Sequence, residues 1–223
     1  ASRTSLSGVE LPYRYFSLLR LLGAEETRCA GLAALPEVWN GAGGARSFRF
    51  PEGEPLQPGF VSVRFTDRDY LFGAKAAASK TFDSGWSLSA AADARTGRDM
   101  HVEGVFTNAL TAGLRLARRF GEGHELALLC IVPPSTRGTR LSSSEEAFSL
   151  TGDRLYNPAW GFQDGRVRNS RVRRETVPLA VVAYEVPLTP ATSLAAAFGA
   201  EAGVSKYSML DWYDARTPMP DNY

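Results

Sequence analysis

The residues best suited to bind a ligand lie in one segment, LYNPAWGFQDGRVRNSRV, which spans residues 155–172. Arg166, Arg168 and Arg171 carry guanidinium groups, which form forked hydrogen bonds to carboxylates and phosphates. These side chains are therefore candidate contacts for an anionic ligand. The alternative interpretation is that they pair with acidic residues of neighbouring loops.

Aromatic side chains supply a second kind of candidate contact. Tyr156 and Trp160 lie in the same segment, and Trp212 and Tyr213 follow near the end of the chain. Their rings are able to stack on a sugar or a peptide. Packing of the rings within their own loops is the competing interpretation, and we favour it.

The segment 155–172 must itself be a loop. It is too rich in Arg, Asn and Gly for a core strand, and Asn157-Pro158 and Asp164-Gly165 predict turns. A further motif, SSSEE at residues 142–146, has the spacing of a helix cap from Ser143 to Glu146. We favour a solvated acidic turn there.

No pattern in the sequence predicts catalysis or a bound cofactor. The chain has no GxSxG or HExxH motif and no paired carboxylates with an obvious shared site, so we expect no enzyme. Cys29 and Cys130 lie far apart, and His101 and His124 have no partner at metal-ligand spacing. GAGGAR, residues 41–46, resembles a phosphate loop, but Arg46 takes the place of the last glycine, which favours a glycine turn with positive φ.

Composition narrows the class of protein. The 223 residues hold 25 Lys and Arg against 24 Asp and Glu, which argues against a nucleic-acid binder that acts through bulk charge. The length suits one large domain or two small ones. The chain opens without Met, a basic segment or an apolar one, and we expect it to be an internal fragment of a longer protein.

The elements that must position these loops are β-strands. Apolar and polar residues alternate over residues 86–95, 110–119 and 193–205, with a weaker case at 70–79. In this pattern Leu114 lies on the apolar face and Arg115 on the polar face. Residues 125–132 and 176–186 are apolar on both faces, and Pro178 predicts an edge or a strand end.

The lengths of the connections distinguish between β architectures. The connections at 81–85, 121–123 and 187–191 are short, whereas 96–108, 133–175 and the residues after 206 are long; 66–69 is a tight turn on the long-loop side. Alternation alone also fits a soluble sandwich. Short turns at one end and long loops at the other are typical of an outer-membrane β-barrel.

Residues 1–50 follow a different pattern. Residues 16–23 predict a short helix, and 36–59 form a turn-rich crossing into the strands.

Several motifs resemble those of TonB-dependent receptors of the outer membrane, of the type with a carboxypeptidase-regulatory-like N-terminal domain. They are VEGVF at 102–106, the YNPxWGxxxGxxRNxR pattern from Tyr156 to Arg171, and the WYxAxxPxPxxY pattern from Trp212 to Tyr223. Asp214 stands where Asn is more usual. NGAGGARSFRF at 40–50 resembles the end of a plug domain more loosely, with Asn40 and Ser47 where Gly and Asn are common.

The resemblance implies an all-β fold: part of a transmembrane antiparallel β-barrel, about seven N-terminal strands, preceded by the C-terminal end of a plug domain. Residues 1–50 would belong to the plug and 51–223 to the first strands and outer loops of a barrel of roughly 22 strands. The arginines of residues 155–172 would then face anionic lipid headgroups as a further alternative.

The implied function is active uptake of a siderophore, glycan or peptide in the cell outer membrane. The implied partners are outer-membrane lipid, an extracellular small ligand and the TonB complex, which would contact a plug segment absent from this chain. The alternative is a β-rich surface binding protein or adhesin that does not transport.

Overall fold

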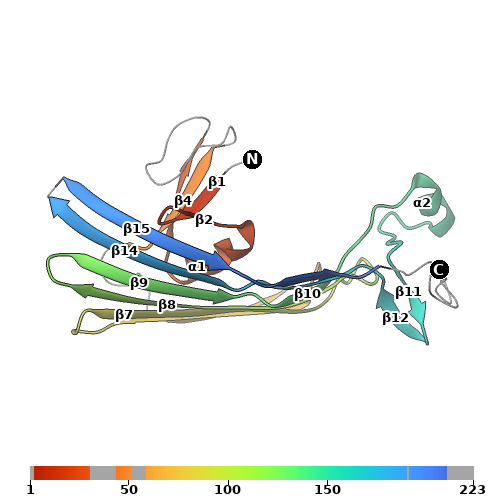
Figure 1. The fold of residues 1–223 in the computed structure, drawn as a ribbon. Coiled ribbons are helices and arrows are strands. Elements are labelled where there is room, and N and C mark those ends of the chain that lie inside the picture. Colours follow the sequence, from red (N-terminus) through yellow and green to blue (C-terminus); the bar gives the residue numbers. More distant parts are fainter. Residues whose placement is uncertain (1–2, 31–43, 52–58, 190, 210–223) are drawn as a thin grey trace.

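A computed structural model describes residues 3–30, 44–51, 59–189 and 191–209. It has three parts: a long curved sheet, a small N-terminal unit against the concave face of that sheet, and an outer loop at one end (Figure 1). We call the sheet the wall, residues 3–51 the N-terminal unit, and residues 139–171 the outer loop.

The wall is a meander in which each long strand pairs with the next in antiparallel fashion. Its strands are β5 (Phe60–Phe65), β6 (Phe72–Thr81), β7 (Trp86–Arg98), β8 (Phe106–Phe120), β9 (His124–Val132), β14 (Leu179–Thr189) and β15 (Thr192–Glu201). Beyond short interruptions, β10 (Ser135–Gly138), β13 (Val172–Thr176) and β16 (Val204–Tyr207) continue β9, β14 and β15. The described residues thus form seven long strands, which confirms the predicted antiparallel fold.

The interruptions lie side by side in three neighbouring strands. They fall at residues 133–134, 177–178 and 202–203, which we call the break line. Prolines at 133, 134 and 178 cause two of them, because proline has no backbone N–H to donate to a neighbouring strand. Single bonds still cross the line, from Leu110 N to Pro134 O at 3.0 Å and from Ala202 N to Pro178 O at 3.3 Å.

The connections have the predicted asymmetry. Residues 82–85 and 121–123 join strands at one end of the wall, where β14 also ends at Thr189 and β15 begins at Thr192. The longer segments 66–71, 99–105 and 139–171 join strands at the other end. The expected long loop at 133–175 is shorter than predicted, because β10 and β13 extend the sheet into it. Their residues, STRG and VRRET, lack the apolar alternation that marks the rest of the wall.

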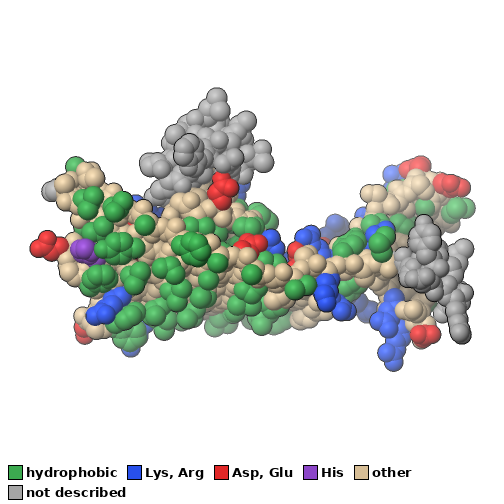
Figure 2. Space-filling view, in the orientation of Figure 1, with side chains coloured by type: hydrophobic (Ala, Val, Ile, Leu, Met, Phe, Trp, Pro, Cys, Tyr) green, Lys and Arg blue, Asp and Glu red, His purple; other side chains and the backbone are tan. Residues whose placement is uncertain are grey.

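The two faces of the wall carry different side chains. On the convex face apolar residues are exposed, including Leu114 at 44% and Phe198 at 73%. Figure 2 shows hydrophobic side chains along the strands, with most Lys and Arg toward the long-loop end. On the concave face Arg115 pairs with Glu125 and lies 4.4 Å from the ring centre of Phe50 in the N-terminal unit. The predicted assignment of Leu114 and Arg115 to opposite faces is confirmed.

The N-terminal unit has a four-stranded sheet of its own. Its order is β2 (Val9–Glu10), β1 (Arg3–Leu6), β4 (Ala45–Arg49), β3 (Glu25–Cys29), and β1 and β4 run parallel. A 3-10 turn, η1 (Tyr13–Tyr15), leads into α1 (Phe16–Leu21), which is the helix that the sequence predicts. Strand β4 lies in the segment predicted as a crossing, where five residues with three polar side chains give little periodicity. Gly44 has φ +88°, as the glycine-turn interpretation requires; residues 31–43 lie outside the described residues.

The main core joins the N-terminal unit to the wall. Leu18 and Leu19 of α1 are fully buried against wall residues that include Leu129 and Ile131. Gly113 of β8 makes this close approach possible, since a Cβ there would lie 2.5 Å from Leu18 Cδ2. The shared core fixes the unit on the concave face of the wall.

The outer loop contains two small elements of its own. Strands β11 (Trp160–Gln163) and β12 (Arg166–Asn169) form a hairpin whose turn residues Asp164 and Gly165 have φ 51° and 69°, as predicted. The favoured acidic turn at 142–146 is wrong: Glu145–Thr151 forms helix α2. Its N-cap is Ser144 rather than Ser143, with Oγ accepting from Ala147 N at 3.2 Å.

Candidate ligand-binding site

A cavity of about 790 Å³ lies between part of the N-terminal unit and the concave face of the wall. Its described lining comes from η1, α1, β3 and β4 on one side and from β7, β8, β10 and β13 on the other. Pro133 and Val177 of the break line also contribute. The volume suits a small molecule rather than a protein segment.

Arginine dominates this lining, and we call the space the basic cavity. The described arginines are Arg14, Arg20, Arg28 and Arg46 from the N-terminal unit and Arg95, Arg137 and Arg173 from the wall. Asp93 and Glu175 are the acidic residues of the described lining. Tyr13 and Phe16, whose ring centres lie 5.2 Å apart, add an aromatic surface.

One carboxylate holds three arginines of the N-terminal unit in place. Glu26 accepts from Arg28 Nε at 2.6 Å, pairs with Arg20, and lies 3.6 Å from Arg46 Nη1. Hydrogen bonds from Arg28 lower the pKa of Glu26, and Arg20 lowers it further, although partial burial opposes them. Glu26 therefore stays ionised at neutral pH and positions the three guanidinium groups without neutralising all of them.

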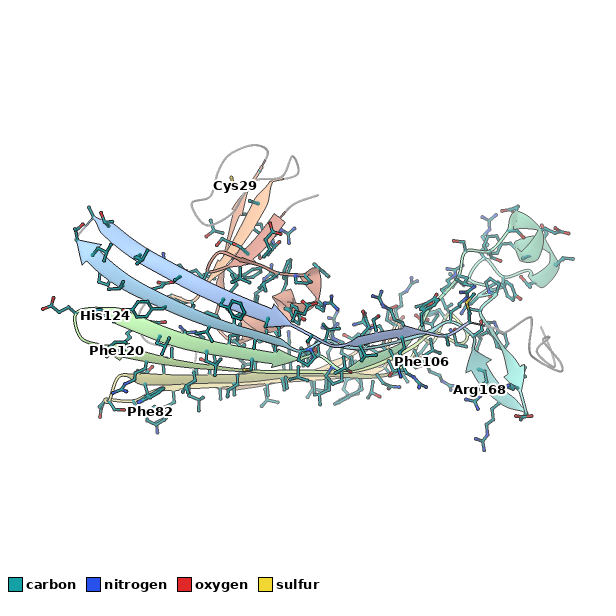
Figure 3. All side chains as sticks on the ribbon, in the orientation of Figure 1. Cys29, Phe82, Phe106, Phe120, His124 and Arg168 are labelled. Atoms are coloured by element: carbon teal, nitrogen blue, oxygen red, sulfur yellow. The ribbon has the colours of Figure 1, made fainter. Side chains whose placement is uncertain are left out.

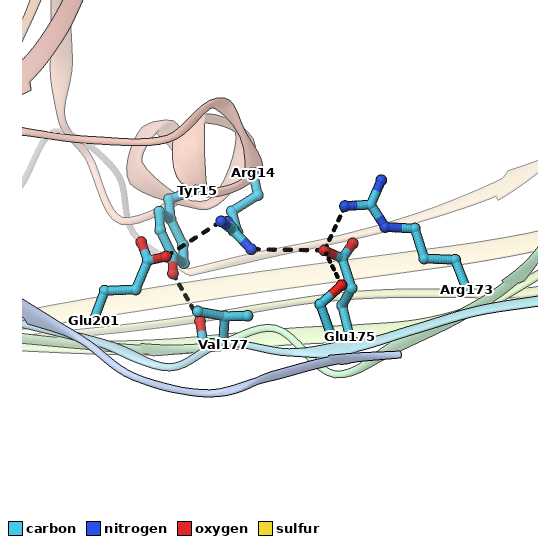
Figure 4. Close-up of polar contacts among 7 residues, drawn as sticks. Arg14, Tyr15, Arg173, Glu175, Val177 and Glu201 are labelled. Atoms are coloured by element: carbon cyan, nitrogen blue, oxygen red, sulfur yellow. Dashed lines mark hydrogen bonds and ion pairs between the residues drawn. The ribbon is translucent and has the colours of Figure 1, made fainter. Parts of the chain in front are cut away.

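Arg14 connects the N-terminal unit to two strands of the wall (Figure 4). Its Nη2 donates to Glu201 Oε1 at 3.2 Å, and its Nη1 lies 3.8 Å from Glu175 Oε1. Glu175 also accepts from Arg173 at 2.7 Å and from Ser205 at 3.2 Å. Arg14 is therefore bonded closely to one carboxylate and only loosely to the other.

Tyr15 provides a second link at the same place. It is fully buried, and its hydroxyl donates to the carbonyl of Val177 in the break line at 2.7 Å. Burial raises the pKa of Tyr15, and the neighbouring Glu201 raises it further. The hydroxyl therefore keeps its proton and remains a donor over the physiological pH range.

Arg95 of the wall, like Arg173, is paired with a carboxylate of its own strand. Asp93 accepts two hydrogen bonds from Arg95, at 3.0 and 2.9 Å. Seven guanidinium groups line the cavity. The carboxylates of the described lining and of the ion pairs given above number four, those of Glu26, Asp93, Glu175 and Glu201. The described surroundings of the cavity thus carry an excess of positive charge.

Two asparagines fold the outer loop onto the β7–β8 connection. Asn157 is fully buried; its amide donates to Glu103 O at 2.9 Å, and its Oδ1 accepts from Leu141 N and Ala159 N, both at 3.1 Å. Asn169 donates to Gly104 O at 2.8 Å and to Thr139 O at 3.0 Å. Much of the YNP and RN motifs therefore serves loop structure.

The predicted ligand contacts lie apart from the basic cavity. Trp160 packs on Gly104, where a Cβ would lie 2.4 Å from Trp160 Cβ, and its ring meets Phe162 edge-on with centres 5.6 Å apart. Arg166 and Arg168 are exposed on the β11–β12 hairpin, and Figure 3 shows Arg168 at the far end of the molecule.

The remaining predicted contacts are partly described. Tyr156 is half-buried in the outer loop, and Arg171 lies 5.7 Å from the ring centre of Tyr207. Trp212 and Tyr213 lie outside the described residues. Within the described part of the chain, the structure therefore brings the five contacts into the loop region and outside the lining of the basic cavity.

The arginines of the basic cavity were not predicted as a site. A usable signal exists for the wall members: Arg95 lies on the polar face of its strand, the same face as Arg115. The arginines of the N-terminal unit carry no such signal, because they meet only through the fold of β3, β4 and α1.

The histidines and cysteines form no metal site among the described residues, where groups of three or more His, Cys, Asp or Glu suited to a metal are absent. His101 Nε2 lies 2.8 Å from Asp67 Oδ2 in the long-loop region, and His124 Nδ1 lies 2.7 Å from the Tyr184 hydroxyl near the short turns. Cys29 and Cys130 form no disulfide there.

No described helix has the length and apolar character needed to span a membrane.

Comparison with known proteins supports the fold. No family profile and no curated protein matches the sequence. Among solved structures, the ferric-catecholate import receptor Fiu from E. coli K12 is similar, with a TM-score of 0.63 and 10% sequence identity over 92% of this chain and 32% of that receptor. The chain spans about a third of that receptor's length, and at this identity the likeness concerns the fold alone. The described residues form a mostly β fold that resembles part of that receptor.

Proposed function

We propose that this chain is part of an outer-membrane receptor that takes up a small extracellular ligand with energy delivered through TonB. In this proposal residues 1–50 are the C-terminal part of a plug, and 51–223 are the first strands and outer loops of the barrel. The observation that carries it is a wall with an apolar convex face whose concave face is filled by a separate folded unit.

The dimensions of the apolar band support a position in a bilayer. Near the short turns, Phe82, Trp86 and Phe120 are exposed, and Figure 3 labels Phe82 and Phe120 at this end of the wall. Toward the long loops, Phe65 and Phe72 form an aromatic pair. Phe72 pairs with Thr96, ten residues along β7 from Trp86, which is about 33 Å of strand. A tilt of about 40° reduces this to roughly 25 Å, the height of the apolar band of outer-membrane barrels.

Ligand contact would take place in two stages. Tyr156, Trp160, Arg166, Arg168 and Arg171, with Trp212 and Tyr213, would meet the ligand at the outer loops, and the basic cavity would hold it against the N-terminal unit. The similar receptor is named for ferric-catecholate import, so ligands of that kind belong in the first set to be tested.

Uptake by whole cells tests the proposal. Cells that carry the full-length receptor are given labelled ferric-catecholates, oligosaccharides and peptides, and accumulation is compared with that of cells lacking it. We expect one class to accumulate, and we expect the accumulation to stop when a protonophore removes the proton gradient or when TonB is deleted. Surface binding without energy-dependent accumulation would instead support a non-transporting binding protein or adhesin.

A further inference from the structure

We propose that the basic cavity binds a compact polyanion, and that this ligand displaces Arg14 from the carboxylates that connect the N-terminal unit to the wall. This inference rests on the proposed function, because it names the ligand class of the same receptor. It begins with the charge balance. The whole chain has a formal net charge of +1, yet seven guanidinium groups gather around one cavity with four carboxylates beside them.

Several anionic groups on one molecule match this arrangement better than a single one. The arginines line opposite sides of the cavity, with Arg46 on the N-terminal unit and Arg137 and Arg173 on the wall. A lone carboxylate occupies one guanidinium fork, whereas a ligand with several phosphates or carboxylates satisfies both sides at once. The volume of about 790 Å³ limits the ligand to a small molecule.

The contacts of Arg14 explain how such a ligand would affect the fold. Glu201 lies within hydrogen-bond distance at 3.2 Å, but Glu175 lies at 3.8 Å and already accepts from Arg173 and Ser205. A polyanion in the cavity offers Arg14 and Arg173 stronger partners than these shared carboxylates. When Arg14 turns to the ligand, the bond from Tyr15 to Val177 remains at this place.

Calorimetric titration of the full-length receptor, purified in detergent at about 150 mM NaCl, tests the inference. The probes are inositol hexakisphosphate, tripolyphosphate and citrate as polyanions and maltotriose as a neutral ligand. We expect at least one polyanion to bind and maltotriose not to bind. Binding of maltotriose alone, or of no probe, would overturn the inference.

Charge-matched variants locate the binding. Arg46→Gln/Arg137→Gln removes two cavity charges while Glu26 keeps Arg20 and Arg28, and it should weaken polyanion binding roughly tenfold or more. The control Arg68→Gln/Arg154→Gln removes two charges from exposed residues outside the lining of the cavity and should change the affinity by less than about twofold. Equal losses in the two variants would show attraction by overall charge and overturn the inference.

Glu201→Gln tests the displacement of Arg14. It removes the closest competitor for Arg14, so polyanion affinity should rise, and an unchanged or lower affinity would contradict the exchange. Heat-modifiable migration in gels confirms that each variant is folded. Proton-driven uptake of a neutral ligand would overturn this inference and leave the proposed function intact. Binding of polyanions without any uptake would support this inference and contradict the proposed function.

Discussion

Asn157 shows how a single buried amide holds a long surface loop. Its side chain satisfies two backbone N–H groups and one backbone carbonyl, from residues 141, 159 and 103. Asn157→Ala leaves these groups without their partner, and a buried unsatisfied group costs about 1–3 kcal/mol. We expect the outer loop of the full-length receptor to lose amide protection in hydrogen exchange.

Arg168→Ala is the control for this substitution, because Arg168 is exposed on the same loop. It should leave the protection of residues 139–171 unchanged. Equal protection in Asn157→Ala and the natural protein would mean that the loop does not depend on this amide.

The carboxylate of Asp99 determines how acid should affect the β7–β8 connection. Its carboxylate accepts from the backbone N–H of Asp69, His101 and Val102 at 2.8–2.9 Å. Burial opposes ionisation, but these three bonds prevail and lower the pKa of Asp99. A carboxyl whose pKa is lower in the folded state stabilises that state above the unfolded pKa of about 3.9, and the contribution is lost as pH falls through the folded value.

Amide protection of residues 69, 101 and 102 should therefore stay constant from neutral pH to about pH 4.5 and fall below that. Asp99→Asn should show weaker protection with no change in this acidic range. A loss of protection that is complete well above this range would contradict the role of Asp99.

At the residue scale the sequence predicted turns better than it predicted contacts. Asp164-Gly165 forms the expected turn because its chemistry is local. The roles of Asn157 and Asn169 depend on carbonyls about 54 and 65 residues away, which no local pattern encodes. The seven proposed ligand contacts stay predictions.

At the element scale, we expect the same charged side chain to cost different amounts of free energy on the two faces of the wall. Leu114 lies on the convex face and pairs with Ala90 and Cys130, midway along the apolar band, whereas Thr111 lines the basic cavity opposite Asp93. Leu114→Arg should cost about 2–4 kcal/mol in the bilayer. Thr111→Arg should cost less, because Asp93 and water are able to solvate the charge.

The fraction of full-length protein assembled in the outer membrane measures both substitutions. We expect strong loss for Leu114→Arg and near-normal assembly for Thr111→Arg. The reverse order would mean that the convex face does not contact lipid.

Periodicity predicted the wall because most of its strands alternate between an apolar and a polar environment. It failed for β10 and β13, whose largely polar residues lie beyond the break line, and it reached only the first two residues of β16. It failed again for β4 and α2, where five and seven residues are too few to show a period. Register and the position of the N-terminal unit follow from long-range packing and were not predicted.

At the scale of the whole molecule, the wall has two open edges. Within the described residues β5 pairs only with β6, and β15 and β16 pair only with β14 and β13. Unpaired backbone groups at such edges cost several kcal/mol each in lipid and promote association in water. We expect residues 1–223, expressed alone, to aggregate or to require detergent.

Size-exclusion chromatography with light scattering checks this expectation. A monodisperse monomer without detergent would show that the edges and the convex face tolerate water, and would contradict the assignment to a membrane barrel.

The break line has a mechanical consequence. Arg14 and Tyr15 attach the N-terminal unit to Glu175 on one side of the line, to Glu201 on the other side and to Val177 within it. A load pulling the unit away from the wall would thus reach the sheet where cross-strand bonding is already sparse. The strands should therefore separate first at the break line, while the continuous hydrogen-bonded pairing of β7 with β8 stays intact.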